Sequence, residues 1–183
     1  MSSLITIDSK GGCLMGIGFI RRVGLCALIA GATLSFSAGC ADAEITQAQS
    51  ELPTEVLTIT GHNGEAHRFT VEIARSPQEQ EIGEMFRKQI APDRGMLFLW
   101  SKPQESAMWM RNTFVPLDLV FIDTDHRIHA IEENAVPLSE GIISSHGIVG
   151  SVLELPGGTT ERLGLVVGDR VDSIAFGAKV SPQ

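Results

Sequence analysis

The segment from Ala107 to Asp118 concentrates side chains that could hold a ligand. It supplies the indole of Trp109, the guanidinium of Arg111, the amide of Asn112 and a carboxylate at Asp118. A guanidinium can bind a carboxylate or phosphate through two parallel hydrogen bonds, and an indole offers a large apolar surface with one donor. These residue types therefore indicate recognition of a small polar molecule.

Two carboxylates, at Asp118 and Glu154, occur inside strongly apolar stretches. A carboxylate that enters a core needs a partner, and Arg87 and Arg111 are the candidate partners for Asp118. One interpretation is an ion-pair network that fixes strand ends. The other is a ligand-binding cleft formed by Arg87, Trp109, Arg111, Asn112, Asp118 and Glu154.

Two other kinds of chemistry remain open. Asp118 and Glu154 could act as an acid–base pair on an envelope glycan or peptide, as paired carboxylates do in sugar hydrolysis. Met108 and Met110 could bind Cu(I) together with a histidine, because thioethers are soft ligands, although methionine commonly fills core gaps. Neither pattern is diagnostic, so we predict no dedicated catalytic residue, metal ion or cofactor.

The elements that must position these residues are mostly short strands. A hairpin is expected around the turn residues 61–64, and Ser76, Pro77 and Glu79 form the start of a short helix with a capping box. Further strands are expected at 96–100, 119–122, 127–131, 152–155 and 171–175, with a loop at 139–151 and at most a short helix at 159–163. The pattern predicts a mainly β fold, an antiparallel β-sandwich or partly open barrel with one short helix.

The N-terminal region has the pattern of an export signal. Arg21 and Arg22 precede an apolar run at 23–38 that is short for a membrane span. We expect residues 1–43 to be a signal peptide, or alternatively a lipoprotein signal that is cleaved before Cys40. The protein would then be periplasmic or otherwise exported, with a lipid on Cys40 as its only means of membrane attachment.

The expected processing leaves a linker at 44–54 and a single β-rich domain at 55–183. The three cysteines, Cys13, Cys26 and Cys40, all fall at or before the cleavage sites. No internal disulfide is therefore expected, and the domain must be stabilised by its core.

The charge balance narrows the range of partners. The chain has a formal net charge of −8 and no cluster of lysine and arginine. Nucleic-acid binding needs a basic surface that displaces counterions, so nucleic acid is excluded as a partner. The expected partner is a small polar molecule or another component of the cell envelope.

Several short motifs occur in a fixed order: Gly95–Phe98, Trp109–Thr113, Pro116–Asp118, Val152–Glu154 and Gly164–Asp169. In these motifs the chain resembles the domain of unknown function 192 family, also called uncharacterised protein family 0127, over roughly residues 55–177. The resemblance implies a β-rich fold and no particular reaction. One departure lies just before Arg87: the family usually has a Gly-Leu-Met-type sequence there, whereas this chain has Gly83, Glu84, Met85 and Phe86. The resulting prediction is an exported, non-catalytic binding module.

Overall fold

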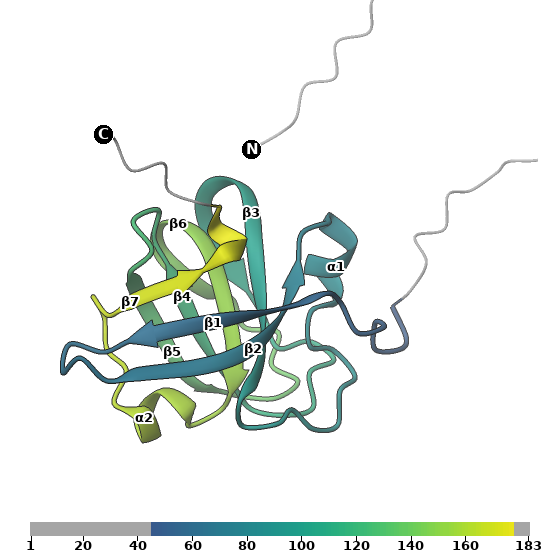
Figure 1. The fold of residues 1–183 in the computed structure, drawn as a ribbon. Coiled ribbons are helices and arrows are strands. Elements are labelled where there is room, and N and C mark those ends of the chain that lie inside the picture. The colour runs from purple at the N-terminus through teal and green to yellow at the C-terminus, as the bar shows by residue number, and fades with distance from the viewer. Residues whose placement is uncertain (1–44, 178–183) are drawn as a thin grey trace, which may run out of the picture. The chain divides into compact units, whose positions relative to one another are not determined.

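A computed structural model describes residues 45–177 of the protein, and these residues belong to a single compact unit. The expected signal peptide, with Cys40, lies outside the described residues. The described residues form seven strands and two short helices, whose arrangement can be followed in Figure 1: β1 (Thr54–Thr60), β2 (Ala66–Ala74), α1 (Pro77–Ile82), β3 (Arg94–Met108), β4 (Leu117–Ile122), β5 (Ile128–Ala135), β6 (Ile143–Pro156), α2 (Thr159–Leu163) and β7 (Arg170–Ser173). A 3-10 turn, Ile174–Phe176, follows β7.

The seven strands form one mixed sheet in the order β5-β4-β6-β3-β2-β1-β7. All neighbouring pairs are antiparallel except β2 and β3, which are parallel. The sheet curls until its two edge strands approach each other. Arg127 and Arg170 form a bridge there, and the Ile128 N–H donates to the Asp169 carbonyl. The predicted mainly β fold is confirmed, as a partly open barrel.

Each face of the sheet carries its own apolar cluster, because successive side chains in a strand point to opposite faces. On one face, Leu97 of β3 and Leu153 of β6 pack with side chains of β1, β2, β4 and β7. On the other face, Met96 and Phe98 of β3 pack with Val152 and with β4 residues. The central strands are thus covered on both sides, which is why they read as continuous apolar runs in the sequence.

Local sequence signals determine several element boundaries. Ser76 and Glu79 form the predicted capping box at the start of α1, and Pro77 occupies its first turn. Gly164 ends α2 in the left-handed conformation (φ 64°), which glycine adopts without steric cost. The predicted hairpin between β1 and β2 is also present, with the turn at 61–65.

The prediction of a loop at 139–151 is wrong for most of that range. β6 begins at Ile143, and its first half pairs with the far end of β3, where Met108 lies opposite Ile143 and Ala107 opposite Ser144. A Gly- and Ser-rich sequence has little strand propensity of its own. This segment becomes a strand through its hydrogen bonds to β3, and such a distant pairing cannot be predicted from the sequence of the segment alone.

A linker is predicted at 44–54. Its described residues 45–53 have no helix or strand, but they contact the domain through hydrogen bonds. The Gln49 amide donates to the carbonyls of Glu79 and Gly83, and the Leu52 N–H donates to Glu72 Oε2 at 2.8 Å. This segment therefore forms part of the surroundings of Glu72.

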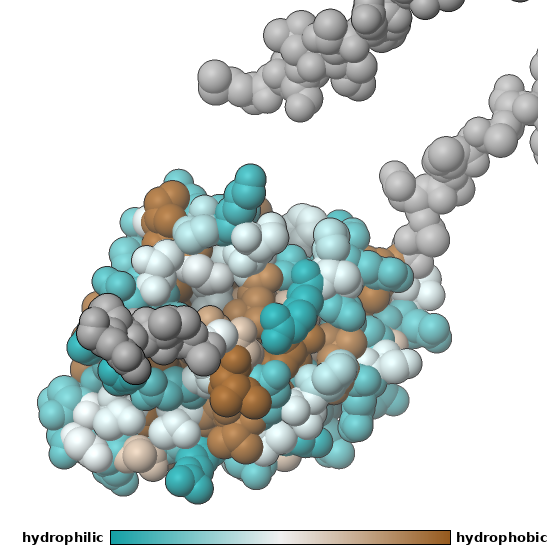
Figure 2. All heavy atoms as spheres, turned by 45° about the horizontal axis from the view of Figure 1, so that its top comes forward, coloured by the Kyte–Doolittle hydropathy of each residue, from teal (hydrophilic) through white to brown (hydrophobic). Residues whose placement is uncertain are grey.

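The surface of the domain is mixed in polarity. Large apolar side chains that remain exposed include Val56, Phe114, Val136, Leu138, Ile142 and Ile174. On the face shown in Figure 2, apolar side chains gather near the centre among polar ones. No helix within residues 45–177 is long and apolar enough to cross a membrane.

Candidate functional site

A row of side chains crosses three neighbouring strands on one face of the sheet. Glu72 of β2 lies opposite Met96 of β3, and Met96 lies opposite Glu154 of β6. Residues directly opposite each other share a face, so Glu72 and Glu154 flank the Met96 thioether. The row places two acidic residues on the face that otherwise carries the Met96 and Phe98 core cluster.

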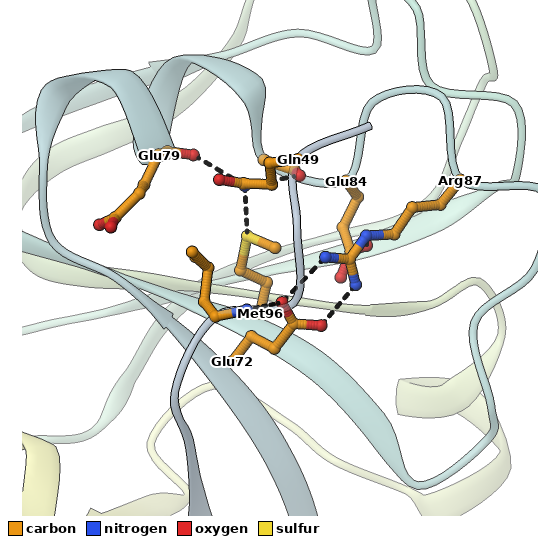
Figure 3. Close-up of polar contacts among 8 residues, drawn as sticks. Gln49, Glu72, Glu79, Glu84, Arg87 and Met96 are labelled. Atoms are coloured by element: carbon orange, nitrogen blue, oxygen red, sulfur yellow. Dashed lines mark hydrogen bonds and ion pairs between the residues drawn. The ribbon is translucent and has the colours of Figure 1, made fainter. Parts of the chain in front are cut away.

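The chain that follows α1 brings Glu84 and Arg87 to this row. Arg87 Nη1 and Nη2 donate to the two carboxylate oxygens of Glu72 at 2.6 and 2.9 Å, and Arg87 Nε lies 3.1 Å from Glu84 Oε2. Figure 3 shows the guanidinium of Arg87 beside the carboxylates of Glu72 and Glu84, with Gln49 next to the sulfur of Met96. One arginine thus serves two acidic residues.

Glu72 is held in its ionised form. Burial opposes its ionisation, but the hydrogen bonds from Arg87 and from the Leu52 N–H outweigh burial and lower its pKa. The hydrogen bonds between Arg87 and Glu72 also raise the pKa of Arg87. This bidentate pair needs no further partner and has the geometry of a structural ion pair.

Glu84 and Glu154 are in a different situation. Their residues are 2% and 5% exposed, and within the described residues neither Glu84 oxygen nor Glu154 Oε2 makes a hydrogen bond. Burial raises the pKa of Glu84 to about 7, although Arg87 opposes the shift. Burial, and then the charge of Glu84, raise the pKa of Glu154 well above its ordinary value. The two carboxyls therefore compete for ionisation and together retain a proton near neutral pH.

These two carboxyls line a groove of about 310 Å³ between α1 and the outer end of β3. Its walls are apolar and aromatic: Met85, Phe98, Trp100, Met108 and Trp109. The Trp100 Nε1 is buried and has no hydrogen-bond partner among the described residues. We call this feature the Trp groove. It combines apolar walls with a few polar groups that lack partners, which is typical of ligand-binding pockets.

The backbone around the Trp groove adopts conformations that few residues tolerate. Gly83 has φ 49°, and a Cβ at this position would lie 2.9 Å from Phe98 Cζ and 3.6 Å from Glu154 Oε2. Phe86 has φ 62°, which is uncommon for a bulky residue, and its N–H donates to the Asn112 carbonyl. Such backbone geometry concentrates at functional sites, where the surrounding structure maintains it.

The structure brings five of the six predicted site residues near this groove. Trp109 lines the groove, and the Arg111 guanidinium carbon lies 4.2 Å from the centre of the indole ring. Asn112 occupies a turn (φ 59°) and its amide lies 3.9 Å from Met85 Sδ. Arg87 and Glu154 belong to the acidic row described above.

Asp118 does not join them, and the prediction that Arg87 or Arg111 pairs with it is wrong. Asp118 lies opposite Leu155, whereas Glu154 lies opposite Leu119, so the two carboxylates point to opposite faces of the sheet. Asp118 Oδ1 accepts from the Asn134 and Gly158 N–H groups, and Oδ2 from the N–H of Thr160. The joint acid–base role of Asp118 and Glu154 is therefore excluded by strand register.

The geometry expected for a copper site is also absent from the described residues. Met108 and Met110 are buried in the core cluster on the Met96 face. No histidine is among the residues that line the Trp groove, and no group of three metal-binding His, Cys, Asp or Glu side chains occurs within residues 45–177. A copper site would require Met108, Met110 and a histidine to converge at an accessible point.

The sequence reading missed Glu72 and Glu84. Glu72 occurs in an alternating strand, Phe69–Ile73, where it reads as an ordinary solvent-facing residue. Glu84 replaces an apolar residue next to Met85, and this departure from the family pattern was the one available signal. Only the strand register and the fold of the loop after α1 place both residues near Glu154.

Comparisons with known proteins agree with this fold. The model of the DUF192 family, described as Uncharacterized ACR, matches residues 58–173. A crystal structure from Sinorhizobium meliloti 1021, of a protein provisionally described as a transcription regulator, is 44% identical with a TM-score of 0.68, covering 70% of this chain and 99% of that one. A protein of unknown function from Novosphingobium aromaticivorans DSM 12444 is 39% identical with a TM-score of 0.65, covering 71% of this chain and 94% of that one. None of the curated proteins compared with the chain matches it.

The architecture is that of a small curled-sheet domain with a groove beside its first helix. The chain belongs to the DUF192 family, since the family model spans most of the described residues.

Proposed function

We propose that this protein is a binding module and that the Trp groove takes a small ligand with an apolar body and a hydrogen-bond-donating head. The observation that carries the proposal is the pair of buried carboxyls, Glu84 and Glu154. Within the described residues Glu154 Oε2 and both Glu84 oxygens make no hydrogen bond, and Glu84 Oε2 has only the ion pair with Arg87 Nε. Leaving such groups unsatisfied is costly, so an arrangement that retains them calls for an explanation. A bound donor would supply the missing hydrogen bonds.

The walls of the groove support the same proposal. Trp109 is 38% exposed beside Phe98, Trp100 and two methionines, so an apolar ligand body could displace water from an aromatic surface. The acid–base chemistry proposed for an envelope enzyme would now fall to Glu84 and Glu154. Their raised pKa values favour this second candidate function, because one carboxyl could donate a proton while the other accepts one.

We also propose that the protein acts in the cell envelope after export, through the signal at residues 1–43 or a lipid on Cys40. The support for this proposal is the basic and apolar pattern of the N-terminal sequence. A role in transcription, as described for the Sinorhizobium relative, does not fit the acidic charge of this chain, so nucleic acid stays outside the proposal.

The intrinsic fluorescence of the protein offers a direct test. The chain has two tryptophans and no tyrosine, and both tryptophans line the Trp groove. The purified full chain would be titrated with a panel of neutral, cationic and anionic aromatic fragments. We expect saturable fluorescence changes with at least one charge class, and a rise in melting temperature with the same compounds.

A matched pair of variants gives the control. Ala107→Phe would fill the groove from β3, whereas Ala66→Phe places the same side chain at an exposed site outside it. Ligand-induced changes should vanish in the first variant and persist in the second. A panel in which no charge class changes the fluorescence or the melting temperature would refute a ligand-binding function for the groove.

A further inference from the structure

The charges around the Trp groove are unevenly distributed. Glu84 and Glu154 line it directly, and Glu81 of α1 also contributes to its wall. Arg87, the cation next to Glu84, is shared between two acids: its Nη atoms donate to both oxygens of Glu72, and its Nε lies 3.1 Å from Glu84 Oε2. The groove therefore presents more acidic groups than its own cation can balance.

The walls suit a cation as well. The faces of aromatic rings are electron-rich and attract cations, most strongly at tryptophan, and thioethers are polarizable. Phe98 and Trp100 lie with their ring centres 6.2 Å apart, and Trp109 already stacks with the guanidinium of Arg111. The net charge of −8 also favours the approach of a cation over that of an anion.

From this arrangement we infer that the Trp groove binds a primary ammonium carried on an apolar stem, with the ammonium between Glu84 and Glu154 and the stem against the aromatic walls. The inference rests on the proposed binding function and specifies its ligand class. A primary ammonium has three donors and no acceptor, so it can bond to both carboxyls at once. A free amine and a lysine-type side chain of a peptide share this chemistry.

Binding of the ammonium is coupled to release of a proton. In the empty groove the two carboxyls retain a proton, because burial raises the pKa of both. When the ammonium enters, its charge replaces that of the proton, which passes to the solvent. Affinity should therefore rise with pH between about 5.5 and 8. Other charged groups lie around the pair. The acidic ones are Glu51 of the N-terminal segment, Glu72 of β2 and Glu81 of α1. The basic ones are Arg87 in the loop after α1, Arg94 of β3 and Arg111 in the loop after β3.

The test compares a cation with its neutral counterpart. Phenethylammonium chloride and 2-phenylethanol have the same aromatic stem, and each would be titrated into the full chain at pH 8 and pH 5.5 by fluorescence and calorimetry. We expect the ammonium compound to bind at least about tenfold more tightly than the alcohol at pH 8, and to lose about tenfold in affinity at pH 5.5. Nα-acetyl-lysine methylamide is a second probe, which reports whether a peptide-borne ammonium binds better than a free amine.

Variants locate the effect. Glu154→Gln is close in shape and should lower the affinity for the ammonium compound by at least about tenfold, because it removes one charge from the pair. Glu161→Gln, on the exposed surface of α2, should leave the affinity unchanged.

The inference would be overturned if the alcohol binds as well as the ammonium compound, if affinity does not change with pH, or if neither ammonium probe binds. Binding of the alcohol, or of anionic fragments, without the ammonium probes would leave the binding function standing while refuting the ligand class.

Discussion

Asp118 and Glu154 lie on the neighbouring strands β4 and β6, and both are buried, yet their surroundings differ completely. Asp118 accepts hydrogen bonds from the backbone N–H groups of Asn134, Gly158 and Thr160, and the Thr160 hydroxyl lies 2.9 Å from Oδ2. Glu154 Oε2 has no hydrogen-bond partner among the described residues, and Glu154 lines the Trp groove together with Glu84. A one-residue step in register sends them to opposite faces.

The contrast shows why burial alone does not identify a functional acid. Three backbone donors complete the hydrogen bonding of Asp118, and in return Asp118 fixes the turn into α2 and the end of β5. Glu154 Oε2, in contrast, makes no hydrogen bond that would hold a neighbouring segment in place. Ionisation of Glu154 lowers the stability of the fold, because a buried charge without a partner is costly. The acid whose hydrogen bonds are complete is a structural element, and the acid with an unpaired oxygen is the one to which we assign the proposed ligand.

The largest expected effect is that of Asp118→Asn. The side-chain amide of asparagine has one accepting oxygen and one donating nitrogen. In either orientation its NH2 group would face backbone N–H donors, those of Asn134 and Gly158 or that of Thr160. We expect the free energy of unfolding to fall by about 3–5 kcal/mol, measured by urea denaturation. Asp125→Asn, in the exposed turn between β4 and β5, is the control and should change stability by less than about 0.5 kcal/mol. A mild effect of Asp118→Asn would contradict its structural role.

A pH effect of intermediate size is expected from Glu84. Its pKa in the folded state is about 7, above its ordinary value of 4.5, so between these pH values the folded state binds a proton that the unfolded state has lost. The stabilising contribution of Glu84 is therefore lost as pH rises through this window, and the free energy of unfolding falls by about 3 kcal/mol. Urea denaturation at a series of pH values should show a shallower decline for Glu84→Gln than for the unmodified protein. Equal slopes would show that Glu84 is not the titrating group.

The smallest expected effect has the opposite sign to that of Asp118→Asn. Glu154→Gln removes a buried carboxyl that must otherwise ionise or keep its proton, so stability at pH 8 should rise by about 1–2 kcal/mol. The measurement is again urea denaturation, at pH 8 and at pH 5, where the gain should shrink because the carboxyl is already protonated. Destabilisation comparable to that of Asp118→Asn would mean that Glu154 is also structural.

Elements with local signals could be predicted from the sequence. The capping box at Ser76 and Glu79 and the glycine stop at Gly164 depend on neighbouring residues alone. The first half of β6 could not be predicted, because its Gly- and Ser-rich sequence becomes a strand only through its partner β3. Whether the strands form a sandwich or a barrel was likewise undecided, since closure depends on the distant contact between Arg127 and Arg170.

The candidate site was predicted in part for the same physical reason. Trp109, Arg111 and Asn112 are close in sequence, so their proximity required no knowledge of the fold. Glu72 and Glu154 are far apart in the chain, and they approach each other only because Met96 is their common neighbour in the sheet. Asp118 was grouped with Glu154 because both are acids in apolar runs, and a sequence without known register cannot separate the two faces.

The position of β6 in the sheet determines the order in which the fold can be completed. β6 lies between β3 and β4, although it is made after both of them. While the chain is being synthesised, the edges of β3 and β4 that later pair with β6 remain unpaired, and unpaired strand edges promote aggregation. The hairpins β1–β2 and β4–β5 can form early, but the centre of the sheet closes late. Factors that shield β3 and β4 during synthesis would therefore affect the yield of folded protein more than factors that act on its ends.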